Sequence, residues 1–137
     1  MDIVQMHADN WPASKVAGHA LTLLKKQGTR AMNANGSGCV YSSLDHPNRC
    51  AVGLLLPDYA LMAIHKKELH WSVGNLADRL SEYHLLPKVT NSLKHYLPIL
   101  KALQRFHDNN TRAIKQLTTD TGFSEEDLRQ LYEETRS

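Results

Sequence analysis

The stretch from Cys39 to Asp58 constrains the fold most, because it holds both cysteines of the chain and its longest uninterrupted apolar run. Cys39 to Tyr41 has the apolar and aromatic content of a short strand. The turn-forming residues of 45–48, Asp-His-Pro-Asn, then return Arg49 and Cys50 to the side of that strand. We therefore predict a small β-hairpin between about residues 30 and 50, with the two cysteines on neighbouring segments.

The apolar run after Cys50, Ala-Val-Gly-Leu-Leu-Leu, is short enough to be either a buried strand or one to two turns of buried helix. Hydrophobic periodicity does not separate these alternatives over so short a run. We predict a helix over 50–56, because the run leads directly into Pro57 and Asp58, which stop one element and cap the next. The sequence leaves the structure of residues 59–70, which are rich in histidine and lysine, unassigned.

The same stretch resembles a recurrent pattern in small, mostly uncharacterised proteins of tailed phages and of bacterial genomes that carry prophages. The pattern is Cys-x-Tyr, a polar turn and Cys-Ala-Val-Gly-Leu-Leu-x-Pro-Asp, which here covers 39–58. Lys-Lys-Gln-Gly before it and Leu-Gln-Arg-Phe-His-Asp after it extend the resemblance to residues 20–132. This chain departs from the family in the turn, where Ser42 and Pro47-Asn48 replace an Arg and a Gly. The resemblance implies a phage-type accessory protein and no particular activity.

Length and charge set broad limits on the class of protein. A chain of 137 residues is long enough for one domain with its own core. The formal charge of +2, from 16 basic and 14 acidic residues, demands neither a nucleic acid nor a membrane as partner. No apolar run approaches the length that spans a bilayer, and two cysteines fit a reducing compartment, so we expect a cytoplasmic protein of the host cell.

Apolar residues at helical spacing recur along the rest of the chain. They predict an α+β fold that is predominantly α-helical, with about five helices packed on the hairpin, in one domain over 1–137. The predicted helices lie between Pro12 and Gly28, over 75–83, from Thr90 onward with a bend at Pro98, over 111–121, and from Ser124 onward. Residues 1–8 lack a clear period, which predicts a flexible start or a short strand through Ile3, Val4 and Met6.

Cys39 and Cys50 are the sharpest candidates for chemistry. With His46, His65 and His70 they form a candidate zinc site, since zinc takes thiolate and imidazole ligands. The ten residues between the cysteines differ from the short Cys-x-x-Cys spacing of zinc knuckles. The alternatives are a regulatory disulfide and two buried, reduced cysteines that act as small apolar groups. We expect the last of these, and therefore no cofactor.

A candidate binding patch combines cations with aromatic rings: Tyr41, Arg49, Lys66, Lys67, Trp71 and Tyr83. The alternative interpretation is a scatter of ordinary surface cations. Residues 111–135 imitate a helix-turn-helix, but the second helix begins Glu-Glu-Asp and would point acids at phosphate groups. Binding of nucleic acid is therefore not expected.

The chain contains no Gly-rich phosphate loop, no His-Glu-x-x-His and no Gly-x-Ser-x-Gly. The expected function is therefore non-catalytic: binding and modulating a host component, either a protein or a small signalling ligand. One alternative is a small metal- or thiol-dependent enzyme with its site around Cys39 and Cys50. A second alternative is a nucleic-acid-binding regulator.

A homodimer is a further expectation. Hydrophobic residues make up 42% of the chain, and apolar groups such as Trp71, Leu76, Leu80 and Tyr132 exceed what one small core covers. A two-fold dimer is the commonest way to bury such groups. The alternative is that all of them pack inside one domain.

Overall fold

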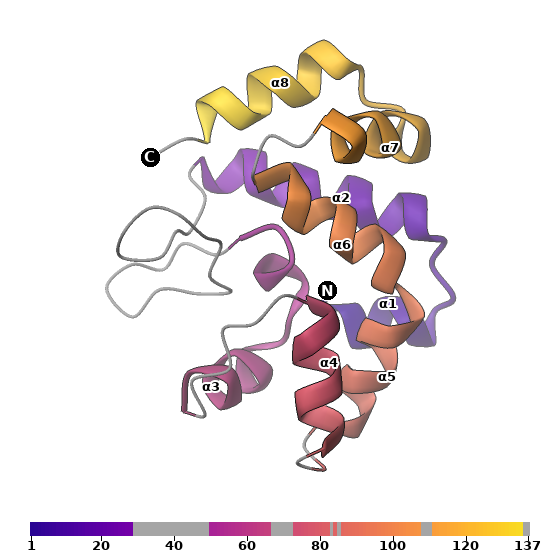
Figure 1. Ribbon diagram of the computed structural model, residues 1–137, viewed down its shortest axis with the longest axis vertical. Coiled ribbons are helices and arrows are strands. Elements are labelled where there is room, and N and C mark those ends of the chain that lie inside the picture. Colours follow the sequence, from indigo (N-terminus) through magenta and orange to yellow (C-terminus); the bar gives the residue numbers. More distant parts are fainter. Residues whose placement is uncertain (29–49, 67–72, 83, 85, 108–110, 136–137) are drawn as a thin grey trace.

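A computed structural model describes residues 1–28, 50–66, 73–82, 84, 86–107 and 111–135 (Figure 1). These ranges contain no strand. They hold α1 (Ile3–Ala8), α2 (Ala13–Gln27), the 3-10 helix η1 (Gly53–Leu55), α3 (Asp58–Lys66), α4 (Val73–Glu82), α5 (Pro87–His95), α6 (Leu97–His107), α7 (Thr111–Thr121) and α8 (Glu125–Glu134). The predominantly α-helical character is confirmed for this part. The predicted hairpin lies outside the described residues, apart from Cys50.

Helix α6 occupies the centre and packs against α2, α4, α5 and α7 (Figure 1). Its buried residues recur at helical spacing, at Ile99, Leu100, Ala102, Leu103 and Phe106. A side chain from α6 also caps the start of α4. Gln104 Oε1 accepts a hydrogen bond from the backbone N–H of Val73, the first residue of α4, at 2.8 Å. The core is thus built around one amphipathic helix whose neighbours come from both halves of the chain.

Helix α2 confirms the prediction made between Pro12 and Gly28. Gly28 adopts φ 90°, the left-handed conformation that ends helices and that glycine reaches without strain. Val16, Ala20 and Leu24 are fully buried along one stripe. Lys25 and Lys26 occupy the last turn, where the helix dipole favours cations.

The prediction of one bent helix from Thr90 is wrong: α5 ends at His95, Tyr96 forms a turn, and α6 begins at Leu97. Pro98 explains the break. In a continuous helix its ring would collide with the carbonyl of Lys94 and remove a hydrogen bond. In the first turn of a new helix the missing N–H has no such cost.

The N-terminal residues form a helix in place of the expected flexible start or strand. The Asp2 side chain caps α1 by accepting a hydrogen bond from the Gln5 backbone N–H at 3.0 Å. Ile3 and Met6, three residues apart, point into the core and are fully buried. Because α1 packs against α5, a segment too short to be helical alone is held by tertiary contacts.

Tyr96 fastens α1 and the start of α2 to α5. Its side chain is buried, and its hydroxyl donates to the backbone oxygen of Trp11 at 2.7 Å and of Met6 at 3.3 Å. The ring lies edge-on to His7 and to His95, whose own rings stack at 4.4 Å between centroids. Burial raises the pKa of Tyr96 above its ordinary 10.0, because the phenolate loses hydration.

We expect Tyr96→Phe to lower the free energy of unfolding by roughly 1 to 3 kcal/mol, because the Trp11 carbonyl loses the hydrogen bond from the Tyr96 hydroxyl, while the Met6 carbonyl keeps the one from the Trp11 N–H. Above pH 10 the folded protein keeps a proton that the unfolded chain releases, so this stability is present below pH 10 and is lost as the pH rises through the raised pKa. Urea unfolding of both proteins across this range measures both effects. Tyr59→Phe, at a side chain 52% exposed, is the matched control. Equal alkaline slopes for wild type and Tyr96→Phe would contradict the assignment.

The helix predicted over 50–56 is confirmed only in part: a turn at 51–52 leads into the single 3-10 turn η1, Gly53–Leu55. The segment after Pro57, which the sequence left unassigned beyond the cap at Asp58, forms α3. Both are buried on their inner side, at Val52, Leu55, Ala60 and Ile64. Among the described helices, none combines the length and apolar character that crossing a bilayer requires.

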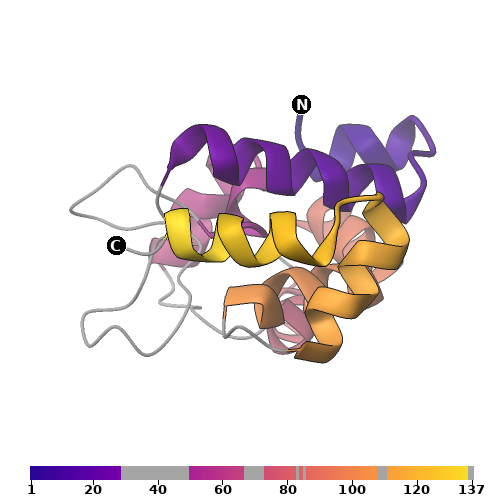
Figure 2. The ribbon, with the colours of Figure 1, turned by 90° about the horizontal axis from the view of Figure 1, so that it is seen from above.

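Helices α7 and α8 form one end of the molecule (Figures 1 and 2). Gly122 adopts φ 79° between them, and Ser124 caps α8 by accepting from the Asp127 backbone N–H at 3.0 Å, as predicted. In the view from above, α8 runs in the same direction as α2 (Figure 2). Helix α7 packs against α2, α6 and α8, so the connection between α7 and α8 comes to lie beside the first half of α2.

Candidate functional site

An open cleft of about 450 Å³ lies between the first half of α2 and the end of α7; we call it the α2–α7 cleft. One wall comes from residues just before and along α2, and the other from the last turn of α7 and the connection to α8. Its lining residues are Trp11, Ser14, Lys15, Gly18, His19, Thr22, Asp120, Thr121 and Phe123. The volume falls within the range of roughly 300 to 1,000 Å³ that is typical of ligand sites.

The aromatic corner of the cleft combines α2 with the residue before its cap. Lys15 and His19 are four residues apart on α2 and share a face, while Trp11 precedes the N-cap Pro12. The Lys15 ammonium lies 4.1 Å from the centre of the Trp11 ring, a cation–π contact. The His19 ring meets the same indole edge-on at 5.7 Å. Phe123 contributes a second aromatic side chain from the opposite wall.

The hydroxyl groups in the cleft are mostly engaged within their own helices. Thr22 donates to the Gly18 carbonyl at 2.8 Å, and Thr121 donates to the Leu117 carbonyl while accepting from the Phe123 N–H at 3.3 Å. Within the described residues, the half-buried carboxylate of Asp120 has neither a hydrogen bond nor an ion pair. Asp120 and Lys15 are therefore the charged groups of the cleft that remain available to a ligand.

Gly18 is unusual because it lies inside a helix without a packing reason. A Cβ added at this position would meet no atom within 4 Å. Glycine in a helix interior costs about 1 kcal/mol relative to alanine. The bare backbone at Gly18 instead deepens the cleft, since any side chain there would project into open space.

Burial lowers the pKa of His19 below its ordinary 6.5, because the imidazolium loses hydration. The unfolded chain therefore binds a proton at a pH where folded His19 is still neutral. This stability is present above pH 6.5 and is lost as the pH falls through the lowered pKa.

We expect the free energy of unfolding to fall more steeply for the wild type than for His19→Gln as the pH drops below about 6.5. Urea unfolding curves at a series of pH values measure the two slopes. The other histidines contribute equally to both proteins, so they cancel in the difference. If the free energy of unfolding of His19→Gln fell with pH as steeply as that of the wild type, the lowered pKa would not belong to His19.

A second cavity, of about 400 Å³, lies between α1 and α5 and brings a serine and a histidine together. His7 Nδ1 lies 3.1 Å from Ser92 Oγ, and the Ser92 hydroxyl donates to the Lys88 carbonyl at 2.9 Å. The contact docks α1 on α5, and the Ser92 hydroxyl directs its proton to a backbone carbonyl and not to the imidazole.

The structure places few of the residues that the sequence singled out. Cys50 is buried, and its sulfur accepts a hydrogen bond from the Gly53 N–H at 3.4 Å, which fits the expected role as a small apolar group. His65 and Lys66 lie in the last turn of α3, with their side chains outside the described part. The remaining candidates lie outside the described residues: Cys39, Tyr41, His46, Arg49, Lys67, His70, Trp71 and Tyr83.

The candidate zinc site and the cation–aromatic patch therefore remain predictions. In the described part of the chain, no group of three or more His, Cys, Asp and Glu side chains is arranged to hold a metal ion. Sequence reasoning missed the α2–α7 cleft. The sequence did contain a signal for its first wall: Trp11, Lys15 and His19 recur at intervals of four residues, and Gly18 lies beside His19.

Comparisons of this chain with known protein families, with curated proteins and with solved structures found no match.

Proposed function

We propose that this protein is a non-catalytic, phage-type accessory protein that binds and modulates a component of the host cell. The observation that carries the proposal is the α2–α7 cleft, in which two aromatic side chains accompany an available ammonium and an available carboxylate. Such a mixture is typical of recognition sites, where apolar groups supply affinity and a few polar groups supply orientation. The resemblance of 39–58 to phage and prophage proteins supports a phage-type origin of the chain.

The lining of the cleft favours binding over catalysis. A hydrolytic nucleophile needs a base within about 3 Å, and no hydrogen bond between described residues joins Ser14 to His19. The one serine–histidine contact described, Ser92 with His7, has its proton directed to a backbone carbonyl. These two observations support a binding role for the cleft.

An exposed apolar pair on α3 supports a macromolecular partner. Tyr59 is 52% exposed and Met62 is 72% exposed, and their spacing of three residues places them on one face. Large apolar groups that remain exposed in a folded domain often belong to an interaction site.

Affinity capture from host lysate tests the proposal, with the wild type and Gly18→Leu as parallel baits. Leucine favours the helix more than glycine and fills the cleft, so the variant is expected to fold. We expect a component that the wild type retains and that Gly18→Leu retains at least about tenfold less, a difference near 1.4 kcal/mol in binding. Capture of the same components in equal amounts by both baits would defeat the proposal.

The homodimer remains a proposal, but the residues that support it differ from those that the sequence indicated. Leu76 and Leu80 are fully buried within the chain and offer no surface to a second copy. Tyr59 and Met62 on α3 are the exposed groups that would pack across a two-fold axis. We expect sedimentation equilibrium to give a mass that rises with concentration above 15.5 kDa, and Met62→Ser to reduce the rise. A constant mass of one chain would exclude the dimer.

A further inference from the structure

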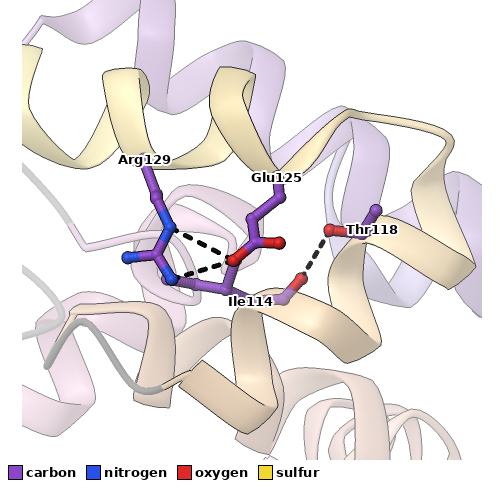
Figure 3. Close-up of polar contacts among 4 residues, drawn as sticks. All are labelled: Ile114, Thr118, Glu125 and Arg129. Atoms are coloured by element: carbon purple, nitrogen blue, oxygen red, sulfur yellow. Dashed lines mark hydrogen bonds and ion pairs between the residues drawn. The ribbon is translucent and has the colours of Figure 1, made fainter.

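The charges around the α2–α7 cleft favour a cationic ligand. Lys15 and Asp120 offset each other within the cleft. Beyond Phe123, the first turn of α8 adds the exposed acids Glu125, Glu126 and Asp127. Glu125 forms an ion pair with Arg129, 2.9 Å apart, which Figure 3 shows. Glu126 and Asp127 therefore remain as the acids of this turn that Arg129 does not neutralise. A polyanion such as a nucleic acid would meet repulsion there.

The apolar part of the cleft has a shape that suits a side chain. Gly18 leaves open space on α2, and Trp11 and Phe123 bound that space on opposite walls. The Lys15 ammonium already rests on the Trp11 ring, so it presents its remaining donors to the cleft. A backbone carbonyl of a bound chain is the natural acceptor for them. Because the cleft is open to solvent, a continuous chain can cross it.

We propose that the α2–α7 cleft binds a basic peptide segment of the partner, with a Lys or Arg side chain on the Asp120 carboxylate and a neighbouring aromatic or large aliphatic side chain over Gly18. The proposal rests on the proposed function, that this chain binds a host component, and narrows that component to a protein. The cation pairs with a half-buried carboxylate that has no partner among the described residues. The apolar side chain occupies the space that glycine leaves open.

Panning a random heptapeptide display library on immobilised wild-type protein, and in parallel on Gly18→Leu, tests this proposal. We expect the wild type to enrich peptides that carry Lys or Arg beside an aromatic or large aliphatic residue, and Gly18→Leu to enrich none of them. A synthetic copy of the leading peptide then serves as the probe in titration calorimetry. We expect Asp120→Asn to weaken its binding at least about tenfold, the loss of one charge-assisted hydrogen bond.

Asp78→Asn is the matched control, because it removes an exposed carboxylate from α4, outside the cleft, and leaves the affinity unchanged. Urea unfolding of each variant shows whether it is folded, and the nearly isosteric Asp120→Asn decides the matter should Gly18→Leu prove unstable. Enrichment of acidic peptides, no enrichment, or equal affinity of wild type and Asp120→Asn would overturn the proposal. A host component that is captured through the cleft without any enriched basic peptide would leave the proposed function standing and remove this ligand class.

Discussion

Replacing Leu100 by alanine lowers the free energy of unfolding by about 2 to 5 kcal/mol, the expected result for a fully buried leucine at the centre of the core. Leu100 lies on α6, the helix against which α2, α4, α5 and α7 all pack. Truncation removes apolar contacts and leaves a cavity that rigid neighbouring helices close only in part. Urea unfolding monitored by circular dichroism measures the loss, and a reduced midpoint without a change in slope would assign it to stability.

Lys101→Ala is the matched control for Leu100→Ala. It changes the next residue of the same helix, whose side chain is exposed, so we expect a change within about 0.5 kcal/mol. A loss below that figure for Leu100→Ala itself would mean that this face of α6 does not form the core. Leu97, which is only partly buried, should give an intermediate result on truncation.

Phe106→Ala should lower the free energy of unfolding by about 3 to 5 kcal/mol. Phe106 is buried at the end of α6, and its ring meets Tyr132 of α8 edge-on, with centroids 6.1 Å apart and planes at 89°. The substitution removes the largest fully buried side chain among the described residues and one of the contacts that hold α8 in place. Thermal and urea unfolding both report the loss.

A double-mutant cycle isolates the aromatic contact from the burial of Phe106. Tyr132→Leu keeps an apolar side chain on α8 and removes the ring, and the double variant with Phe106→Ala closes the cycle. We expect a coupling of about 0.5 to 1.5 kcal/mol, the usual contribution of an edge-to-face pair beyond buried area. Additive losses would show that α8 is held by other contacts.

Local signals predicted those helices whose ends are set by neighbouring residues. Gly28 ends α2, Gly122 separates α7 from α8, and Ser124 caps α8, each through a contact within a few residues along the chain. The apolar stripes of these helices also match their buried faces, as at Leu117 and Leu128. Such features depend on backbone geometry that is the same in any protein, so the sequence alone suffices to predict them.

The tertiary structure decided the features that need a distant partner. Helix α1 is too short to form alone and depends on α5 and on the Tyr96 hydroxyl. Tyr96, in the turn between α5 and α6, meets residues from the start of the chain that no local signal indicated. The hydrophobic periodicity of one segment does not tell which other segment will pack against its apolar face. These features depend on that packing.

The cleft shows the same division between local and distant information. The sequence by itself determined part of its first wall, because helical spacing alone places Lys15 and His19 on one face of α2. Only the tertiary structure brought Asp120 and Phe123 opposite them, through the packing of α7 on α2. Spacing along a helix is fixed by the backbone, whereas the meeting of two helices far apart in the chain depends on the side chains of the whole core.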